Sequence, residues 1–170
     1  MRTSRHHEIT GAIIIDTLGR FLLQQRDDVS GIVHPGKISL FGGHREGHET
    51  YLQCAVREVH EEISHYVSPD RFEYLITYHN PDSDAEGGTV RGKIFIVRNV
   101  PVYSLRVTEG SLLIIEPDKL AAVEHNLTPF ARFAMKAFLD KQATKTRQHA
   151  SGRTGKTDTT SGASRTGRDH

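Results

Sequence analysis

Tryptophan is absent from this 170-residue chain, and cysteine occurs once, as Cys54. A single cysteine excludes an intramolecular disulfide and a zinc site built on paired cysteines, and it fits a reducing compartment such as the cytoplasm. No apolar run reaches the roughly 18 residues that suggest a transmembrane helix, and the polar start of the chain does not resemble a secretory signal. We therefore expect a cytoplasmic protein that is not bound to a membrane.

Aliphatic residues larger than alanine are missing from residues 143–170. This segment is rich in threonine, serine, glycine and arginine and has six basic against two acidic residues, whereas residues 1–142 have sixteen basic against nineteen acidic. Such a tail cannot bury enough apolar surface to offset its loss of conformational entropy. We predict one folded domain over residues 1–142 and a disordered basic tail over residues 143–170, and we consider specific nucleic-acid binding the weaker alternative for the tail.

The chain between residues 51 and 63 combines a helical apolar period with a cluster of carboxylates. Glu58, Glu61 and Glu62 stand at i, i+3 and i+4, so they project from one helical face. Like charges at these spacings repel by about a few tenths of a kcal/mol per pair, and only Arg57 compensates them on that face. We infer that a multivalent cation is the missing partner. The opposite face is expected in the core and consists of Leu52, Ala55, Val56, Val59 and Ile63.

The start of this helix is also marked in the sequence. Thr50 and Gln53 fit a capping box, which places Glu49 at the helix N-terminus, where the helix dipole favours a carboxylate. Upstream, Gly42 and Gly43 permit a tight turn from strand to helix that brings the backbone close to a bound group.

These residues keep a fixed spacing: Gly43, five residues, Glu49, seven residues, then Arg57-Glu58-Val59-His60-Glu61-Glu62. The pattern resembles the Nudix box of the MutT-like Nudix hydrolase family at every fixed charged position. Six residue types at fixed offsets recur by chance in about one in 10⁵ such sequences, if each makes up roughly 6% of usage. Ser64 and His65 depart from the family, which usually has a glycine and an aliphatic residue there, as does Phe41 in place of a common proline. Since that glycine is a left-handed helix stop, Ser64 leaves the helix exit open.

The resemblance implies an α/β fold, namely an α/β/α sandwich with a mixed β-sheet, and Mg²⁺- or Mn²⁺-dependent hydrolysis of a nucleoside diphosphate derivative. It makes Glu58 and Glu62 the principal metal ligands and Glu61 a ligand or the base that activates water. Gly43 would belong to the metal site, and Arg57 would orient the glutamates through charge-assisted hydrogen bonds. Oxygen ligands are those that hard divalent cations prefer, which agrees with this reading.

The family usually adds one acid from a loop before the last strand. Glu109, followed by Gly110, is the best candidate, and Glu86 and Glu116 compete with it. Arg26, at the end of an apolar strand, resembles an arginine that faces substrate phosphate, although a solvated strand-end charge is an equal alternative.

Substrate phosphate is also expected near the glycine turn, where Gly42, Gly43 and His44 are candidate contacts. His44 belongs to a group of histidines that flank the box, the others being His48, His60 and His65. We favour surface or supporting roles for them, because the carboxylates specify a hard ion.

Alternating apolar residues and turn signals predict the remaining elements. The expected strands are residues 9–15, 21–25, 38–41, 71–78, 93–97 and 111–115, with a mobile loop at 27–37, a turn at 80–88 and a last helix that starts at Thr128-Pro129.

The substrate is less well defined by the sequence. Pro81 lies sixteen residues after His65, a spacing that resembles ADP-ribose-cleaving members and favours an ADP-ribose-like or nucleotide-sugar substrate. The alternatives are a MutT-like nucleoside triphosphate pyrophosphohydrolase or a ligand-sensing module without catalysis. The isomerase branch of the family calls for a cysteine outside the box, whereas Cys54 lies inside it. The expected partner is a nucleotide-like small molecule, and a homodimer is left open.

Overall fold

The computed structural model describes residues 6–81 and 88–153, so Glu86 and most of the turn predicted at 80–88 lie outside the described residues. The strands are β1 (His6–Asp16), β2 (Phe21–Gln25), β3 (Ile38–Ser39), β4 (Glu73–Pro81), β5 (Thr89–Val100) and β6 (Ser111–Ile115). The helices are α1 (Tyr51–Ile63), α2 (Leu120–Val123) and α3 (Pro129–Arg153), with single 3-10 turns at Pro69–Arg71, Val102–Ser104, Pro117–Lys119 and Glu124–Asn126. Contacts divide the chain into two units, residues 1–138 and residues 139–170.

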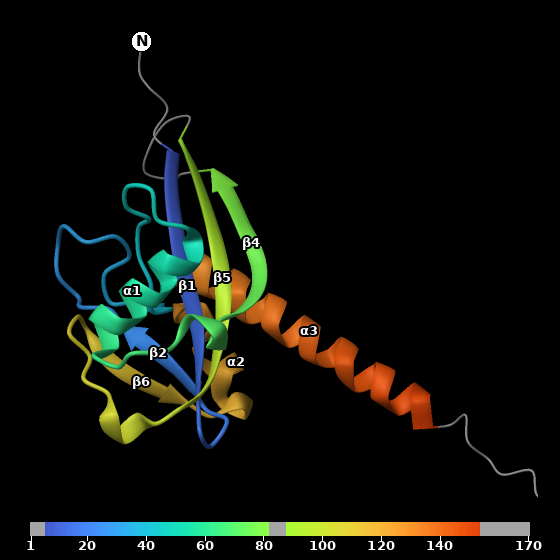
Figure 1. The fold of residues 1–170 in the computed structure, drawn as a ribbon. Helices are drawn as coiled ribbons and strands as arrows, with labels where there is room; N and C mark the ends of the chain where they lie inside the picture. The colour runs from blue at the N-terminus through green and yellow to red at the C-terminus, as the bar shows by residue number, and fades with distance from the viewer. Residues whose placement is uncertain (1–5, 82–87, 154–170) are drawn as a thin grey trace, which may run out of the picture. The chain divides into compact units, whose positions relative to one another are not determined.

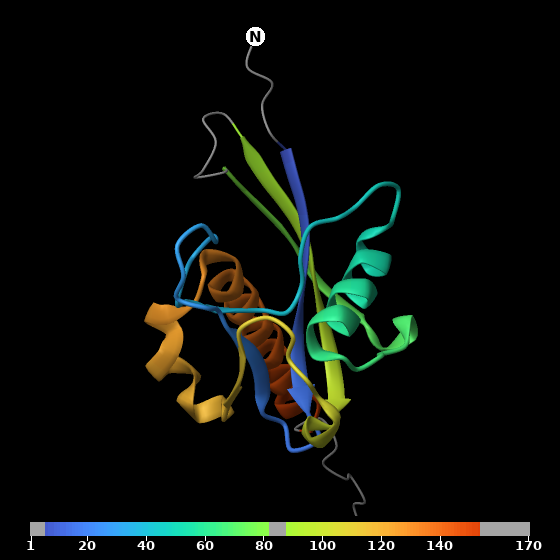
Figure 2. The ribbon, with the colours of Figure 1, turned by 90° about the vertical axis from the view of Figure 1, so that its left-hand side faces the viewer.

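The strands form one mixed sheet in the order β3-β2-β1-β5-β4, and β6 pairs with β2. The β1–β5 pair is parallel, whereas the other pairs are antiparallel. Helix α1 covers one face of the sheet, and the first turns of α3 cover the other (Figures 1 and 2). Each face has its own apolar core: Ile14, Phe41 and Val59 belong to the α1 side, and Ile13, Ile94 and Met135 to the α3 side. The predicted α/β/α sandwich with a mixed sheet is confirmed.

The strand expected at 38–41 changes its partner halfway. Ser39 pairs with β2, but Phe41 forms a bridge with Ala12 of β1, and the Thr10 N–H donates to the carbonyl of Gly43 at 2.9 Å. The segment therefore crosses from one strand to the next as it approaches the glycines. This crossing places the glycine pair beside β1, in front of α1.

Helix α1 begins as the sequence predicts. Both hydrogen bonds of the Thr50–Gln53 capping box are present, and Ala55, Val59 and Ile63 are fully buried. Leu52 and Val56 are only half-buried at the edge of the core. The helix ends at Ser64, which adopts the left-handed conformation with φ 50° and ψ 32°. A serine thus occupies the backbone conformation for which the family uses glycine.

We predict that Ser64→Gly stabilises the fold. The left-handed conformation costs a residue with a Cβ about 1–2 kcal/mol, and the greater freedom of glycine in the unfolded chain offsets part of the gain, so a net increase of about 0.5 kcal/mol is expected. Ser64→Ala, which keeps the Cβ, serves as the control in urea titrations of both variants. Equal midpoints for the glycine and alanine variants would contradict the prediction.

Helix α3 extends beyond the domain boundary predicted at Gln142 and reaches Arg153. Elongation of an existing helix needs no new nucleus, so a segment without apolar residues can continue it. Thr144 and Thr146 donate their hydroxyl protons to the carbonyls of Asp140 and Gln142. The rest of the predicted disordered tail lies outside the described residues and stays a prediction. Within the described residues, no helix is both long and apolar enough to cross a membrane.

A chain that ends at Gln142 is expected to melt within about 1 °C of the full-length protein. Residues 143–149 are exposed, so their removal uncovers little apolar area. Calorimetry of the two proteins at equal concentration measures the difference. A drop of several degrees would show that the last helical turns stabilise the fold.

Candidate active site

Gly42 and Gly43 bring the backbone into contact with both β1 and α1. Gly42 has φ 143°, and a Cβ at this position would lie 2.2 Å from the carbonyl oxygen of Thr10. A Cβ on Gly43 would lie 2.5 Å from the carboxyl group of Glu58. The N–H of Gly42 donates to Glu62 Oε2 at 2.6 Å. The absence of side chains here therefore lets the backbone touch two of the three clustered glutamates.

Arg57 binds the other carboxylates of the box. Its guanidinium donates to Glu49 Oε1 at 2.7 Å and Oε2 at 3.1 Å, to Glu58 Oε1 at 2.9 Å and to Glu61 Oε2 at 3.2 Å. It also donates to the carbonyl oxygen of His44 at 3.1 Å. Hydrogen bonding from Arg57 lowers the pKa of Glu49 to about 2. The arginine thus compensates the exposed side of the cluster.

Glu62 and Glu58 are compensated less completely. The pKa of Glu62 is raised to about 7, chiefly by burial and also by the Glu58 and Glu109 carboxylates, although the hydrogen bond from the Gly42 N–H opposes the shift. Burial also raises the pKa of Glu58, although Arg57 opposes the shift. Glu62 is 8% exposed, whereas the Glu61 side chain is 58% exposed. The buried Glu62 and the half-buried Glu58 therefore form the part of the site with excess negative charge.

The loop that carries Glu109 is attached to the end of α1. The Thr108 N–H donates to the Glu62 carbonyl at 2.9 Å, the Thr108 hydroxyl donates to the Glu61 carbonyl at 3.0 Å, and the Arg106 N–H donates to the Ile63 carbonyl at 3.0 Å. These bonds pair carbonyl groups that a helix end leaves without an internal partner. They also bring Glu109 next to Glu62.

Glu116, the competing acid, lies at the other end of β6. In the β2–β6 pairing Ser111 faces Gln25, whereas Ile115 faces Phe21. About five residues of strand, or roughly 17 Å, therefore separate the two acids. Only Glu109 lies at the end of the strand that approaches the box.

The sequence matches a family model described as "NUDIX domain" over residues 5–148. This chain belongs to the NUDIX domain family. The prediction of a Nudix hydrolase enzyme is thereby confirmed. Comparison with curated protein sequences gives no match.

Solved structures share the fold at low sequence identity. The E. coli ORF135 protein has a TM-score of 0.66 at 23% identity, with 83% of this chain and 94% of that chain covered. A MutT protein from Methanosarcina mazei Go1 has a TM-score of 0.68 at 19% identity, with 84% and 99% covered. A bifunctional NMN adenylyltransferase/ADP ribose pyrophosphatase from Francisella tularensis, complexed with AMP and a Mn ion, has a TM-score of 0.62 at 14% identity, with 83% of this chain and 43% of that chain covered.

The other predicted contacts of this Nudix protein lie around the same region. Arg26 is half-buried at the end of β2, and its Nε is buried without a hydrogen-bond partner. The side chain of His44 is exposed, and its ring meets that of His7 edge-on at 5.5 Å. The rings of His60 and Tyr66 also meet edge-on, at 5.9 Å. These histidines lie at the surface around the box helix.

Two features of the site were not predicted. Gln24, a buried polar residue within an apolar strand, bonds to the Glu62 carboxylate, and its polarity in that strand was the available signal. Glu8 of β1 accepts hydrogen bonds from Tyr51 at 2.7 Å and from Arg45 Nε at 2.8 Å, which ties the turn before α1 to the sheet. Nothing in the local sequence pattern indicated the contacts of Glu8, because its partners Arg45 and Tyr51 lie 37 and 43 positions away.

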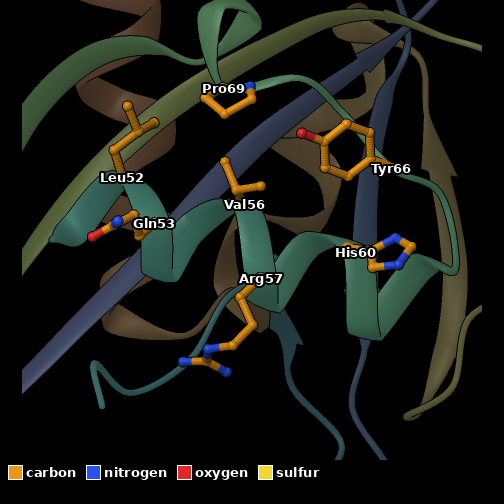
Figure 3. Close-up of a pocket in the computed structure, with 7 residues that line it drawn as sticks. All are labelled: Leu52, Gln53, Val56, Arg57, His60, Tyr66 and Pro69. Carbon is orange, nitrogen blue, oxygen red and sulfur yellow. The ribbon is translucent and has the colours of Figure 1, made fainter. Parts of the chain in front are cut away.

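A mainly apolar groove lies along α1 on the side of Leu52 and Val56. Leu52 and Val56 point toward Pro69 and Tyr66, whereas Arg57 points away from them (Figure 3). The groove has a volume of about 270 Å³ and contains no carboxylate. It accounts for the incomplete burial of two residues expected in the core.

The carboxylates fit a divalent cation by their chemistry, because they supply oxygen ligands and carry uncompensated charge. As they stand, the described residues contain no group of three histidine, cysteine, aspartate or glutamate side chains that could hold a metal ion. Arg57 donates to one oxygen each of Glu58 and Glu61, and the Gly42 N–H donates to one oxygen of Glu62. A carboxylate oxygen that accepts one hydrogen bond keeps a further lone pair, so these contacts are compatible with a cation.

Proposed function

We propose that this Nudix enzyme is a Mg²⁺- or Mn²⁺-dependent hydrolase that cleaves the pyrophosphate of a nucleoside diphosphate derivative, with ADP-ribose-like compounds or nucleotide sugars as the favoured substrates. The observation that carries the proposal is the pair of carboxylates beside the glycine turn, the buried Glu62 and the half-buried Glu58. A cation would offset their repulsion, and the substrate phosphate would lie near the glycine turn.

Each residue has a role in this proposal. Glu58 and Glu62 would hold the metal, with Glu61 as a further ligand or the base that takes the proton of the attacking water. A bound divalent metal would supply charge neutralisation at phosphate and a water of lowered pKa. Arg57 would hold Glu58 and Glu61 in orientation, and Arg26, which is half-buried at the end of β2, would contact phosphate with its guanidinium group.

Two observations bear on the choice of substrate. The F. tularensis relative is named as an ADP ribose pyrophosphatase, and Pro81 stands as the last residue of β4, opposite Thr89. Nucleoside triphosphates are the second candidate, because the M. mazei relative is named MutT. We also retain the predicted cytoplasmic location, since the one cysteine is buried and free.

A hydrolysis panel tests the function. ADP-ribose, nucleotide sugars and nucleoside triphosphates are incubated with the full chain in Mg²⁺, in Mn²⁺ and in chelator, and the products are identified. We expect metal-dependent release of a nucleoside monophosphate from ADP-ribose or a nucleotide sugar. Pyrophosphate release from triphosphates alone would favour the second candidate, and no turnover of any of them would contradict the proposal.

Glu109→Gln is predicted to weaken the Mg²⁺ dependence and turnover together, by about 10- to 100-fold, as changes around a metal site commonly do. Glu116→Gln is the matched control, because Glu116 lies at the far end of β6. Mg²⁺ titrations of turnover compare the two variants with the wild-type protein. A normal curve for Glu109→Gln with a shifted curve for Glu116→Gln would move the role to Glu116.

A further inference from the structure

A single amide group joins two acidic segments of the site. Gln24 lies near the end of β2 and is 3% exposed. Its Nε2 donates to Glu62 Oε1 at 3.3 Å and to the carbonyl oxygen of Glu109 at 3.1 Å. A glutamine NH₂ group has two protons, so this geometry uses both of them. The contacts connect residues 38 and 85 positions away from Gln24.

The Glu62 carboxylate is held at both oxygens. Oε2 accepts from the Gly42 N–H and Oε1 accepts from Gln24. A carboxylate held at one oxygen can still rotate about its last bond, whereas two donors on different elements fix its plane. The orientation of Glu62 therefore depends on Gln24 as well as on the glycine turn.

The Glu109 loop approaches β2 closely at the same place. Gly110 has φ 66°, and a Cβ there would lie 2.3 Å from the carbonyl oxygen of Gln25. On the other side, Thr108 is bonded to the end of α1. Gln24 is the side chain that bonds to the loop between these two anchors, at the carbonyl of the acidic residue itself.

We propose that Gln24 is a positioning residue, which sets the carboxylate of Glu62 and the backbone of Glu109 at a fixed separation so that both acids serve one cation. The part of this proposal that concerns the cation rests on the proposed function. The positioning of Glu62 and Glu109 rests on the hydrogen bonds of Gln24. An amide suits this role because it donates to both groups without adding another negative charge. A carboxylate in its place would raise the repulsion in a site that already has an excess of negative charge.

The test compares Gln24→Met with Gln25→Met in the full chain. Methionine is similar in length to glutamine but has no N–H donor. Gln25 is the matched control: it is the next residue in β2, and its Nε2 donates to the Gly36 carbonyl at 2.8 Å, in a loop that contains none of the glutamates assigned to the metal site. Mn²⁺ affinity is measured by electron paramagnetic resonance without substrate, and amide hydrogen exchange of Thr108 is measured without metal.

We expect Gln24→Met to bind Mn²⁺ about 10-fold more weakly and to exchange the Thr108 amide faster, with Gln25→Met unchanged in both. Gln24→Asn, which keeps an amide but is one methylene shorter, should shift both measurements in the same direction and guards against a folding defect in Gln24→Met. Wild-type Mn²⁺ affinity in Gln24→Met, or an equal loss in Gln25→Met, would overturn the proposal. If the wild-type protein binds no Mn²⁺, the proposed function fails, and the Thr108 exchange rates still decide whether Gln24 holds the loop.

Discussion

Glu62→Gln is expected to stabilise the metal-free protein at neutral and alkaline pH while it abolishes activity. The pKa of Glu62 is raised from 4.5 to about 7 by burial, so the folded state binds the proton more tightly than the unfolded chain. The stability of the wild-type protein must then fall as the pH rises from about 4.5 to about 7. A neutral glutamine avoids the cost of burying an ionised carboxylate, and its side-chain carbonyl oxygen can still accept the hydrogen bond from the Gly42 N–H.

The size of this effect follows from the shift. Each pKa unit corresponds to about 1.4 kcal/mol, so the variant should exceed the wild-type protein by roughly 1–3 kcal/mol above pH 7 and match it near pH 4.5. Urea titrations in chelator from pH 4.5 to 8.5 measure the difference. Added Mg²⁺ should stabilise the wild-type protein and have less effect on the variant, because a ligand stabilises only the state that binds it.

Turnover of the same variant should fall at least about 10²-fold, or roughly 2.7 kcal/mol of transition-state stabilisation. A gain in stability together with a loss of turnover indicates a functional carboxylate. Loss of a structural carboxylate would lower both stability and turnover. Full activity in Glu62→Gln would remove Glu62 from the proposed metal site. A variant that is less stable at pH 8 would show that the buried carboxylate is not strained.

Gly42→Ala is expected to be the most destabilising single change at the site. A methyl group 2.2 Å from the Thr10 carbonyl oxygen cannot be accommodated without movement of β1 or of the turn, and φ 143° is a conformation almost confined to glycine. We expect a loss of at least about 3 kcal/mol. Turnover should fall as well, because the Gly42 N–H is one of the two donors to Glu62.

Gly47→Ala is the control for this change. Gly47 also has positive φ, at 50°, but a Cβ there would meet nothing within 4 Å, so only the backbone cost of about 1–2 kcal/mol applies. Thermal unfolding of both variants separates the backbone cost from the steric cost. Similar melting temperatures for the two would contradict the close approach of Gly42 to β1.

The sequence predicted the local elements of this fold well and its long-range contacts poorly. The capping box at Thr50 and the start of α3 at Pro129 depend on neighbouring residues and were located correctly. The helix exit at Ser64 was left open, because its conformation depends on packing that the sequence does not display. Helix α3 continues past Gln142, where the composition changes, because composition measures the ability to form a core and not the ability to extend an existing helix. The domain boundary at Gln142 stays a prediction.

The acids of the site illustrate the same limit. The spacing of Glu58, Glu61 and Glu62 is a local property of one helix and could be recognised directly. Glu109 could be chosen only by resemblance, and its proximity to Glu62 follows from bonds between residues more than 40 positions apart. The polarity of Gln24 within an apolar strand was visible in the sequence, but its role was missed because its partners lie 38 and 85 positions away.

The way in which α1 ends has a consequence for the order of folding. The carbonyls of its last turn accept hydrogen bonds from Arg106 and Thr108. Strands β4 and β5 lie between α1 and these two residues in the chain, so the contacts join segments more than 40 positions apart. Helix α1 has its own start signal and can form early, but contacts of such sequence separation form late. The acidic face should therefore stay hydrated during most of folding, so that the burial of Glu62 becomes a cost only in the final docking step. Substitutions of Glu62 would then change the unfolding rate more than the folding rate.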